Sequence, residues 1–326
     1  MAGYVNLSDC SRSAFVALLF CFFVGIGELS AEVLRVVSYN VENLFYPERD
    51  SVNTDSVFTP EGERRWSWSR YSQKVENIAR VLTVIGEWDG VDVAGLQEVE
   101  SKECVERLCQ VLRRGEYDFV HYDSPDRRGI DVALIYKKAR LDTLCTKALR
   151  VDLGEQTTRD ILYVRMKAKG ERREAKGDTI HFFVCHMPSQ LGGASETAWK
   201  RDQAKRVLQR AVDSVLAADI NAKIVVMGDM NNAQFTMHNS QFTIHNLQCK
   251  MDKAKGTHKY QGRWTCLDQF YTSQALDSIS EVRVFDAEWI QEPDEKYLGL
   301  RPKRTFVGFH YQNGFSDHLP IVLVIQ

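Results

Sequence analysis

The chain has 326 residues, of which 44% are hydrophobic and 26% are charged, a balance typical of a globular protein with a sizeable core. That length fits one large α/β domain or two smaller ones. The formal net charge is −2, so no overall positive field attracts the chain to nucleic acid or anionic membranes. This excludes a protein that coats DNA through bulk charge, but not an enzyme that contacts a few phosphates.

The N-terminal segment has the pattern of an export signal. Residues 14–26 are apolar, follow a polar stretch that contains Arg12, and precede the small pair Ser30 and Ala31. This run is shorter than the ~17–25 residues of a membrane-spanning helix and matches a signal-peptide core. We expect residues 1–31 to be a signal peptide, residues 32–326 to be one domain, and the protein to be periplasmic or extracellular. The alternative is a buried N-terminal helix; no transmembrane segment is expected.

Cysteine usage is compatible with export. The cysteines beyond the signal segment are Cys104, Cys109, Cys145, Cys185, Cys249 and Cys266. An even number in an exported chain allows one or two disulfides, and Cys249 with Cys266 is the first pair to test. The alternative is that these residues are small buried hydrophobic groups.

Short apolar runs alternate with amphipathic stretches along the chain. The pattern predicts strands at residues 34–39, 91–96, 132–136, 161–166, 180–185, 224–227 and 319–325, and helices at 73–85, 102–112 and 196–217. Several strands between residues 132 and 185 follow one another without a helix. This order favours paired sheets covered by helices over a β-α-β barrel.

Two long irregular stretches, residues 46–68 and 291–314, interleave arginines with aromatic residues. Long ordered loops are frequently functional, and this composition is typical of surfaces that bind phosphates and bases. We therefore expect Trp66 and Trp68, or Arg304 and Tyr311, to contact a substrate strand.

Polar motifs lie at the ends of the predicted strands. They read SYNVENLF (38–45), GLQEVE (95–100), HMPSQLGG (186–193), MGDMNN (227–232), LDQF (267–270) and SDHLP (316–320). In this reading, Asp268 closes a strand and Asp317 opens the last one. Strand ends at one edge of a sheet converge in space, so the motifs predict one shared site.

In this order the motifs resemble those of the endonuclease/exonuclease/phosphatase superfamily, which includes deoxyribonucleases, abasic-site endonucleases, bacterial sphingomyelinases and inositol-polyphosphate 5-phosphatases. The resemblance extends from about Val33 to the C-terminus. It implies an α/β fold: a four-layer α-β-β-α sandwich of two mixed sheets, forming a single domain with the active site at one rim. The chain would be a bacterial exported member of that superfamily, and its domain a catalytic one.

The resemblance also implies a metal site. Glu98 is the expected ligand, supported by Asn40, and Asp317 supplies a second carboxylate or orients a metal-bound water. Hard oxygen ligands suit Mg²⁺, with Mn²⁺ and Ca²⁺ as alternatives. Breaking a phosphate ester needs such a cation to offset charge. The alternative for Glu98 is a surface carboxylate.

By the same resemblance, Asp229 is a general base or orients the attacking water, and Asn231 holds the water or a phosphate oxygen. Read alone, their GDMN motif is also a turn sequence.

Two histidines are expected to act in catalysis. His318 would pair with Asp268 and His186 with Asp131, and either imidazole would protonate a leaving group or stabilise the phosphorane. The remaining histidines are expected at the surface or in packing.

Substrate contacts are expected from Arg128, Arg159, Ser189, Arg304 and Tyr311. Our first hypothesis is an extracytoplasmic endonuclease with nucleic acid as substrate, acting as a monomer without a stable protein partner. The second is a phosphatase or phosphodiesterase acting on a lipid headgroup or on a sugar or inositol phosphate. The third, an inactive binding module, is disfavoured because every expected reactive position is occupied by a suitable residue.

Overall fold

The computed structural model describes residues 33–48, 56–87, 89–169, 179–237, 244–246, 256–277 and 280–326. The expected signal peptide lies outside these residues, as does Cys249 of the expected disulfide. Within them, no helix is long and apolar enough to cross a membrane. Cys104, Cys109, Cys145 and Cys185 have free thiols.

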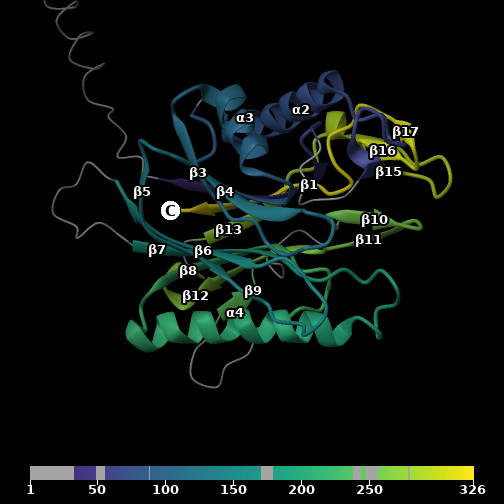
Figure 1. Cartoon of the computed structure of the whole chain (residues 1–326). Helices are drawn as coiled ribbons and strands as arrows, with labels where there is room; N and C mark the ends of the chain where they lie inside the picture. The colour runs from purple at the N-terminus through teal and green to yellow at the C-terminus, as the bar shows by residue number, and fades with distance from the viewer. Residues whose placement is uncertain are drawn as a thin grey trace, which may run out of the picture. The chain divides into compact units, whose positions relative to one another are not determined.

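The core is built on two mixed six-stranded sheets (Figure 1). The first has the order β13 (Ser280–Val284), β18 (Ile321–Ile325), β1 (Leu34–Leu44), β2 (Val93–Val99), β4 (Asp131–Lys137) and β3 (Tyr117–His121). The second has the order β5 (Leu141–Leu149), β6 (Ile161–Ala168), β7 (Thr179–His186), β8 (Lys223–Asp229), β12 (Asp268–Ser273) and β9 (Ile244–Asn246).

Helices cover the outer face of each sheet. Helices α2 (Trp68–Gly86) and α3 (Lys102–Arg113) pack on the first sheet, and α4 (Ala198–Ala218) packs on the second (Figure 1). On α4, Ala204, Leu208, Val212 and Leu216 are buried at intervals of four residues, as the helical periodicity predicts. The expected four-layer α-β-β-α sandwich is therefore confirmed.

The central strands are apolar on both faces because each sheet lies between two layers. In β1, Val36 belongs to the cluster between the two sheets, whereas Val37 belongs to the cluster beneath α2 and α3. In β7, Phe182 and Phe183 divide in the same way between the inner cluster and the one beneath α4. Such strands read as continuous apolar runs rather than alternating ones, which is why they were visible in the sequence.

Strand directions bring the polar motifs to one rim. β1 is parallel to β2, and β7 is parallel to β8, so these strands end on the same side. β12 is antiparallel to β8, with Asp268 directly opposite Asp229. Asp268 therefore opens a strand, and the expectation that it closes one was wrong. Asp268 nevertheless lies at the same edge as Asp229.

The two irregular stretches contain more structure than expected. The second includes the 3-10 helix η3 (Glu288–Ile290) and the short hairpins β14–β15 (Gln291–Pro293, Leu300–Pro302) and β16–β17 (Phe306–Val307, His310–Tyr311). The first includes the 3-10 helix η1 (Ser56–Phe58). Trp66 is fully buried in the cluster with Phe58 and Phe306, so its side chain is not available to contact a substrate strand.

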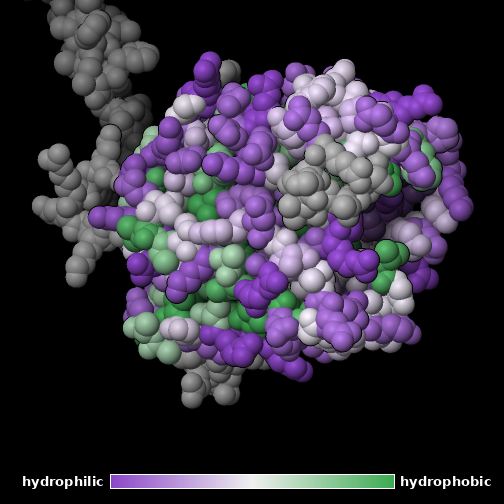
Figure 2. Space-filling view, viewed as in Figure 1, coloured by the Kyte–Doolittle hydropathy of each residue, from purple (hydrophilic) through white to green (hydrophobic). Residues whose placement is uncertain are grey.

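A further hairpin, β10–β11 (His258–Tyr260, Arg263–Thr265), and the short helix α5 (Gln274–Asp277) flank β12. The surface seen in Figure 2 is predominantly hydrophilic, with hydrophobic residues showing mainly between the helical layers. On this side of the molecule, polar residues therefore form most of the surface.

Candidate active site

Backbone irregularities shape the rim where the strands end. The register of β1 shifts between Asn40 and Leu44, and that of β2 shifts between Gln97 and Val99. Left-handed backbone conformations occur at Glu42, Asn43, Glu98 and Asn231, with φ of 52°, 56°, 66° and 47°. Such conformations cost energy in residues other than glycine, and they concentrate at functional sites.

Asn40 joins the two sheets at the centre of the rim. Its Nδ2 donates to Glu98 Oε1 at 3.4 Å and to Asp229 Oδ2 at 3.1 Å, and its Oδ1 accepts from the Glu42 backbone N–H at 3.0 Å. The Asn43 backbone N–H donates to Glu98 Oε2 at 3.0 Å. Asn40 thus acts as a donor that orients two carboxylates, one from each sheet.

His186 faces the same two carboxylates. Its Nε2 lies 3.9 Å from Glu98 Oε1 and 3.7 Å from Asp229 Oδ2. Its Nδ1 has no hydrogen-bond partner among the described residues. Burial, together with the nearby Arg159 and Arg128, lowers the pKa of His186 well below its usual value, so the ring is neutral at neutral pH.

His318 is in the opposite charge state. Its Nδ1 lies 2.7 Å from Asp268 Oδ2 and its Nε2 lies 3.8 Å from Asp229 Oδ2, so the expected pairing with Asp268 is present. Burial alone would lower the pKa of His318, but Asp268 and then Asp229 raise it well above its usual value. The ring is therefore an imidazolium at neutral pH.

Asp229 lies between the two histidines. Its Oδ1 accepts from the Asn231 backbone N–H at 2.8 Å, and Asn231 Nδ2 donates to the Met187 carbonyl at 2.9 Å. Burial raises the pKa of Asp229 to about 6, although His318 acts in the opposite direction. A carboxyl with this pKa exchanges protons near neutral pH, as a general base must.

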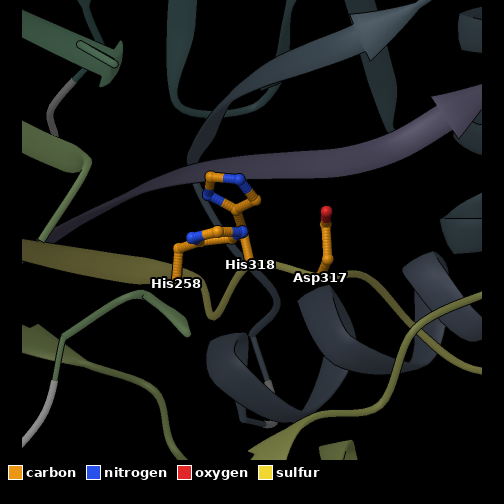
Figure 3. Close-up of side chains that lie close together, drawn as sticks. All are labelled: His258, Asp317 and His318. Atoms are coloured by element: carbon orange, nitrogen blue, oxygen red, sulfur yellow. The ribbon is translucent and has the colours of Figure 1, made fainter. Parts of the chain in front are cut away.

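His258 belongs to the site, although it was expected to be a surface or packing residue. The centroid of its ring lies 4.8 Å from that of His318, and Figure 3 shows the two rings against each other with Asp317 beside them. Burial lowers the pKa of His258 to about 4, and His318 adds to the effect. His258 comes from the β10–β11 hairpin, far from any recognisable motif, so the sequence offered no local signal for it.

A buried lysine near the site, Lys74, was also not predicted from the sequence. Lys74 of α2 donates from Nζ to Thr305 Oγ1 at 2.5 Å and to the Phe315 carbonyl at 2.6 Å, and it lies 3.9 Å from Glu42 Oε2. Glu42 accepts from the Thr305 backbone N–H at 2.6 Å. Burial raises the pKa of Glu42 to about 7 and lowers that of Lys74 to about 8. This network fixes the segment before β18 against β1 and α2.

The last residues of that segment enter the site directly. Ser316 Oγ donates to the Asn40 carbonyl at 2.6 Å, and the His318 backbone N–H donates to Ser316 Oγ at 3.0 Å. Asp317 lies between them in sequence. Burial opposes its ionisation, but His318, His258 and Arg304 together lower its pKa below the usual range. Asp317 is therefore charged, as a metal-binding carboxylate must be.

Positive groups surround these carboxylates. Arg128 donates from its guanidinium to Asn43 Oδ1, and Arg159 pairs with Asp126 at 3.5 Å; both lie close enough to influence His186. Arg304 similarly influences Asp317 and His258. The expected substrate-binding arginines are thus brought to the rim.

Ser189 and Tyr311 are the remaining residues that were expected to contact a substrate. Ser189 Oγ is exposed and accepts from the Leu191 backbone N–H at 3.1 Å, and the adjacent Gln190 donates to the Asn231 carbonyl at 2.6 Å. The Tyr311 ring packs on Phe306 and is contacted by the Arg70 guanidinium. Tyr311 thus lies on the same segment as Arg304, but it is partly engaged in packing.

The expected pairing of His186 with Asp131 was wrong. Asp131 opens β4 and accepts at Oδ1 from the backbone N–H and the hydroxyl of Ser124, while its Oδ2 faces His121 at 3.8 Å. Burial raises the pKa of Asp131 to about 7. Asp131 is one strand away from Glu98, because it lies opposite Val99 in the sheet.

The donor set fits a hard divalent cation. Carboxylate oxygens of Glu98 and Asp229 lie within 4 Å of Nε2 of a neutral His186. The side-chain amide of Asn40 donates a hydrogen bond to both carboxylates. Asp317 lies close to His258 and His318 and can supply a further carboxylate beside these groups. Converging carboxylates that share one neutral donor are stabilised by a cation, and Mg²⁺ prefers such oxygen ligands.

The fold and the site together define a class of protein. The chain belongs to the endonuclease/exonuclease/phosphatase family, whose model matches residues 35–326. No curated protein sequence matches the chain.

Solved structures with the same fold include an endonuclease/exonuclease/phosphatase family protein from Bacteroides thetaiotaomicron, with 17% identity, a TM-score of 0.58, and coverage of 90% of this chain and 98% of the other. A mannosyl-6-phosphatase from Bacteroides thetaiotaomicron VPI-5482 has 16% identity, a TM-score of 0.56, and coverage of 90% and 100%. The human Nocturnin catalytic domain with bound sulfate has 16% identity, a TM-score of 0.56, and coverage of 90% and 94%. At these identities the likeness concerns the fold.

Proposed function

We propose that this protein is a divalent-metal-dependent phosphoesterase whose active site is the rim around Asn40. The observation that carries this proposal is the convergence of Glu98 and Asp229 on a neutral His186, with the imidazolium of His318 on the other side of Asp229. An acid, a base and a candidate metal-binding carboxylate thus lie within one small volume. Phosphate-ester hydrolysis needs this combination.

Glu98 and Asp317 would hold the cation, with Asn40 keeping Glu98 in position through its amide N–H. We assign Mg²⁺, with Mn²⁺ and Ca²⁺ as alternatives. When bound, the cation offsets the charge of the phosphate and lowers the pKa of water.

Residues of the chain carry out the proton transfers and stabilise the negative charge. Asp229 Oδ2 accepts the proton of the attacking water, while Asn231 fixes the carboxylate through its backbone N–H. The imidazolium of His318 donates its Nε2 proton to the leaving oxygen, and Asp268 keeps the ring charged and oriented. Neutral His186 donates a hydrogen bond to a phosphoryl oxygen, and Arg128 and Arg159 offset the remaining negative charge.

For the substrate we propose nucleic acid, cleaved internally by an exported enzyme. Arg304 lies near the catalytic residues, and the β16–β17 hairpin beside it carries Tyr311 and the exposed Phe309, which is 59% accessible. Arg64 lies over the Phe309 ring and donates to the Gly308 carbonyl at 2.8 Å. Aromatic rings next to arginines suit the stacking of bases. Export is proposed from residues 1–31.

The alternative substrate is a phosphate ester outside nucleic acid, such as a lipid headgroup or a sugar or inositol phosphate. It is favoured by the similarity in fold to a mannosyl-6-phosphatase. In this case the same catalytic residues act, but the aromatic hairpin is not used.

A parallel assay separates these proposals. The purified protein would be supplied with Mg²⁺, Mn²⁺ or Ca²⁺ and given plasmid DNA, RNA, sphingomyelin, a sugar 6-phosphate and bis-p-nitrophenyl phosphate. We expect metal-dependent nicking that is lost in His318→Ala. Turnover of a lipid or sugar phosphate with intact plasmid would replace the nuclease proposal with the alternative. No metal-dependent turnover of any substrate would overturn the catalytic assignment itself.

The hairpin can be tested separately. Alanine at Arg304 and Tyr311 should reduce plasmid cleavage more than hydrolysis of bis-p-nitrophenyl phosphate, because only the polymer reaches the hairpin. An equal loss of activity on both substrates would contradict a role for these residues in binding nucleic acid.

A further inference from the structure

The connection between β3 and β4 brings together three potential metal ligands away from the proposed catalytic residues. His121 closes β3, Asp131 opens β4, and Asp123 lies between them. One nitrogen of the imidazole and one oxygen of each carboxylate lie within 4.8 Å of one another. His121 Nε2 is 3.8 Å from Asp131 Oδ2, and His121 Nδ1 is 3.8 Å from Asp123 Oδ1.

The imidazole of His121 provides an observation independent of this clustering. Its side chain is only 2% exposed, yet Nε2 has no hydrogen-bond partner among the described residues. A buried polar atom without a partner is unfavourable and calls for an explanation, of which a bound ion is one. The nitrogen faces the Asp131 carboxylate at 3.8 Å, which is too long for a hydrogen bond but shorter than the sum of two bonds of ~2.0–2.2 Å to a shared cation.

Hydrogen bonds from Ser124 orient the Asp131 carboxylate as a potential metal ligand. Ser124 donates its backbone N–H, at 3.1 Å, and its hydroxyl to Oδ1, which leaves Oδ2 directed at His121. Hydrogen bonds that orient a ligating carboxylate in this way are a regular feature of metal sites. Asp123 is 84% exposed, so the cluster is open to solvent on one side and a hydrated ion can enter.

We propose that His121, Asp123 and Asp131 form a second cation site, specific for a first-row transition ion such as Zn²⁺ or Mn²⁺. Mg²⁺ and Ca²⁺ prefer sets made entirely of oxygen ligands, whereas an imidazole favours transition ions. One imidazole and two carboxylates leave a fourth position for water.

The location of the cluster gives such an ion a structural consequence. Asp131 lies opposite Val99, the neighbour of Glu98. The same β3–β4 connection carries Arg128, which reaches Asn43, and Asp126, which pairs with Arg159. An ion bound by His121, Asp123 and Asp131 ties together both ends of this connection. It therefore fixes the path of the segment that carries Arg128 and, through Asp126, contacts Arg159.

The test is calorimetric titration of the full chain with Zn²⁺ in a background that carries Glu98→Gln and Asp317→Asn, so that both carboxylates proposed to hold the catalytic cation are removed. The readout is binding, so no activity is needed. Asp123→Asn is the main variant because its side chain is exposed and its loss should not affect folding. Asp202→Asn, an exposed aspartate on α4, is the matched control for the loss of one negative charge.

We expect Asp123→Asn to weaken Zn²⁺ binding about tenfold or more, while Asp202→Asn leaves it unchanged. His121→Gln should have at least the effect of Asp123→Asn, with circular dichroism confirming that the variant is folded. Equal affinity for Zn²⁺ in the Asp123→Asn and Asp202→Asn variants would overturn the proposal, as would the absence of Zn²⁺ binding in the background that carries Glu98→Gln and Asp317→Asn. Neither outcome bears on the catalytic assignment, which is decided by turnover.

Discussion

Asp268 controls the charge of His318 through one hydrogen-bonded contact of 2.7 Å. Replacing it by asparagine removes the group that raises the pKa of His318, while the burial that lowers this pKa remains. The imidazolium should then lose its proton at lower pH than in the wild type. We expect Asp268→Asn to reduce kcat/KM by about 10²–10³ and to move the alkaline limb of the profile to lower pH.

The measurement is kcat/KM on bis-p-nitrophenyl phosphate with Mg²⁺, from about pH 5 to about pH 9, which extends above the usual range of histidine because the pKa of His318 is raised. Asp202→Asn on α4 serves again as the control for charge. A lowered rate with an unmoved alkaline limb would show that His318 is not the proton donor.

At the residue scale, some members of the site could be assigned from the sequence and others could not. Glu98, His186, Asp229 and His318 could be assigned to one site because each follows or precedes an apolar strand within a recognisable motif. His258 could not, because its place beside His318 depends on how a distant hairpin folds back. Asp131 was assigned the wrong partner because neighbouring positions on a strand point to opposite faces, so an uncertainty of one residue changes the contact.

At the scale of elements, Lys74 links α2 to β1 and to the segment before β18. Lys74→Met leaves the Glu42 carboxylate buried without its cation, which typically costs about 3 kcal/mol. Glu42 has a pKa of about 7 in the folded wild type, and without Lys74 this pKa rises further, whereas the unfolded value of ~4.3 is unchanged. A raised carboxyl pKa lowers stability as pH rises from the unfolded value to the folded value.

The free energy of unfolding of Lys74→Met should therefore continue to fall above about pH 7, where the contribution of Glu42 in the wild type levels off. Urea denaturation at a series of pH values measures this difference. Lys102→Met, at an exposed position on α3, is the control. A constant difference between variant and wild type across the series would contradict the proposed pairing.

The spacing between the two sheets is a second property of the elements that bears on the site. A Cβ added at Gly95 of β2 would lie 2.9 Å from Met227 Cε and 3.1 Å from Val184 Cγ1, both on the other sheet. Gly95→Val should push the sheets apart near Glu98 and Asp229. We expect a loss of about 1–3 kcal/mol in stability, together with a fall in kcat.

Ala94→Val is the matched control, because Ala94 is the preceding residue and faces the helical layer instead. Denaturation and steady-state kinetics of both variants give the comparison. If Ala94→Val lowers kcat as much as Gly95→Val at equal stability, the distance between the sheets is not the cause.

At the scale of the whole molecule, a cation that binds only the folded chain adds to its stability. Mg²⁺ at about a hundred times its Kd should contribute about 2.7 kcal/mol and raise Tm accordingly. EDTA should abolish both turnover and this increase. In Glu98→Gln the increase with Mg²⁺ should be largely lost, and an undiminished shift in that variant would remove Glu98 from the ligand set.

The overall architecture was predictable because strands buried on both faces and a helix with a regular apolar stripe leave clear patterns, and because the motifs resemble those of one superfamily. The short hairpins between residues 291 and 311 were not predictable from such patterns. They have few residues. The last of them is positioned by packing of Phe306 against Phe58 and Arg64, which lie more than 200 residues earlier in the chain. Buried pairs such as Lys74 and Glu42 also depend on tertiary contacts that no local pattern encodes.

The candidate active site takes Glu98 from one sheet and His186, Asp229 and Asp268 from the other. Neither sheet alone carries a complete set, so a partly unfolded chain in which only one sheet persists would have no turnover. Loss of activity in denaturant should therefore follow the separation of the sheets and not the fraying of the outer helices. Enzymatic rate would then serve as a reporter of global folding, one that detects a population of intact molecules too small for spectroscopy.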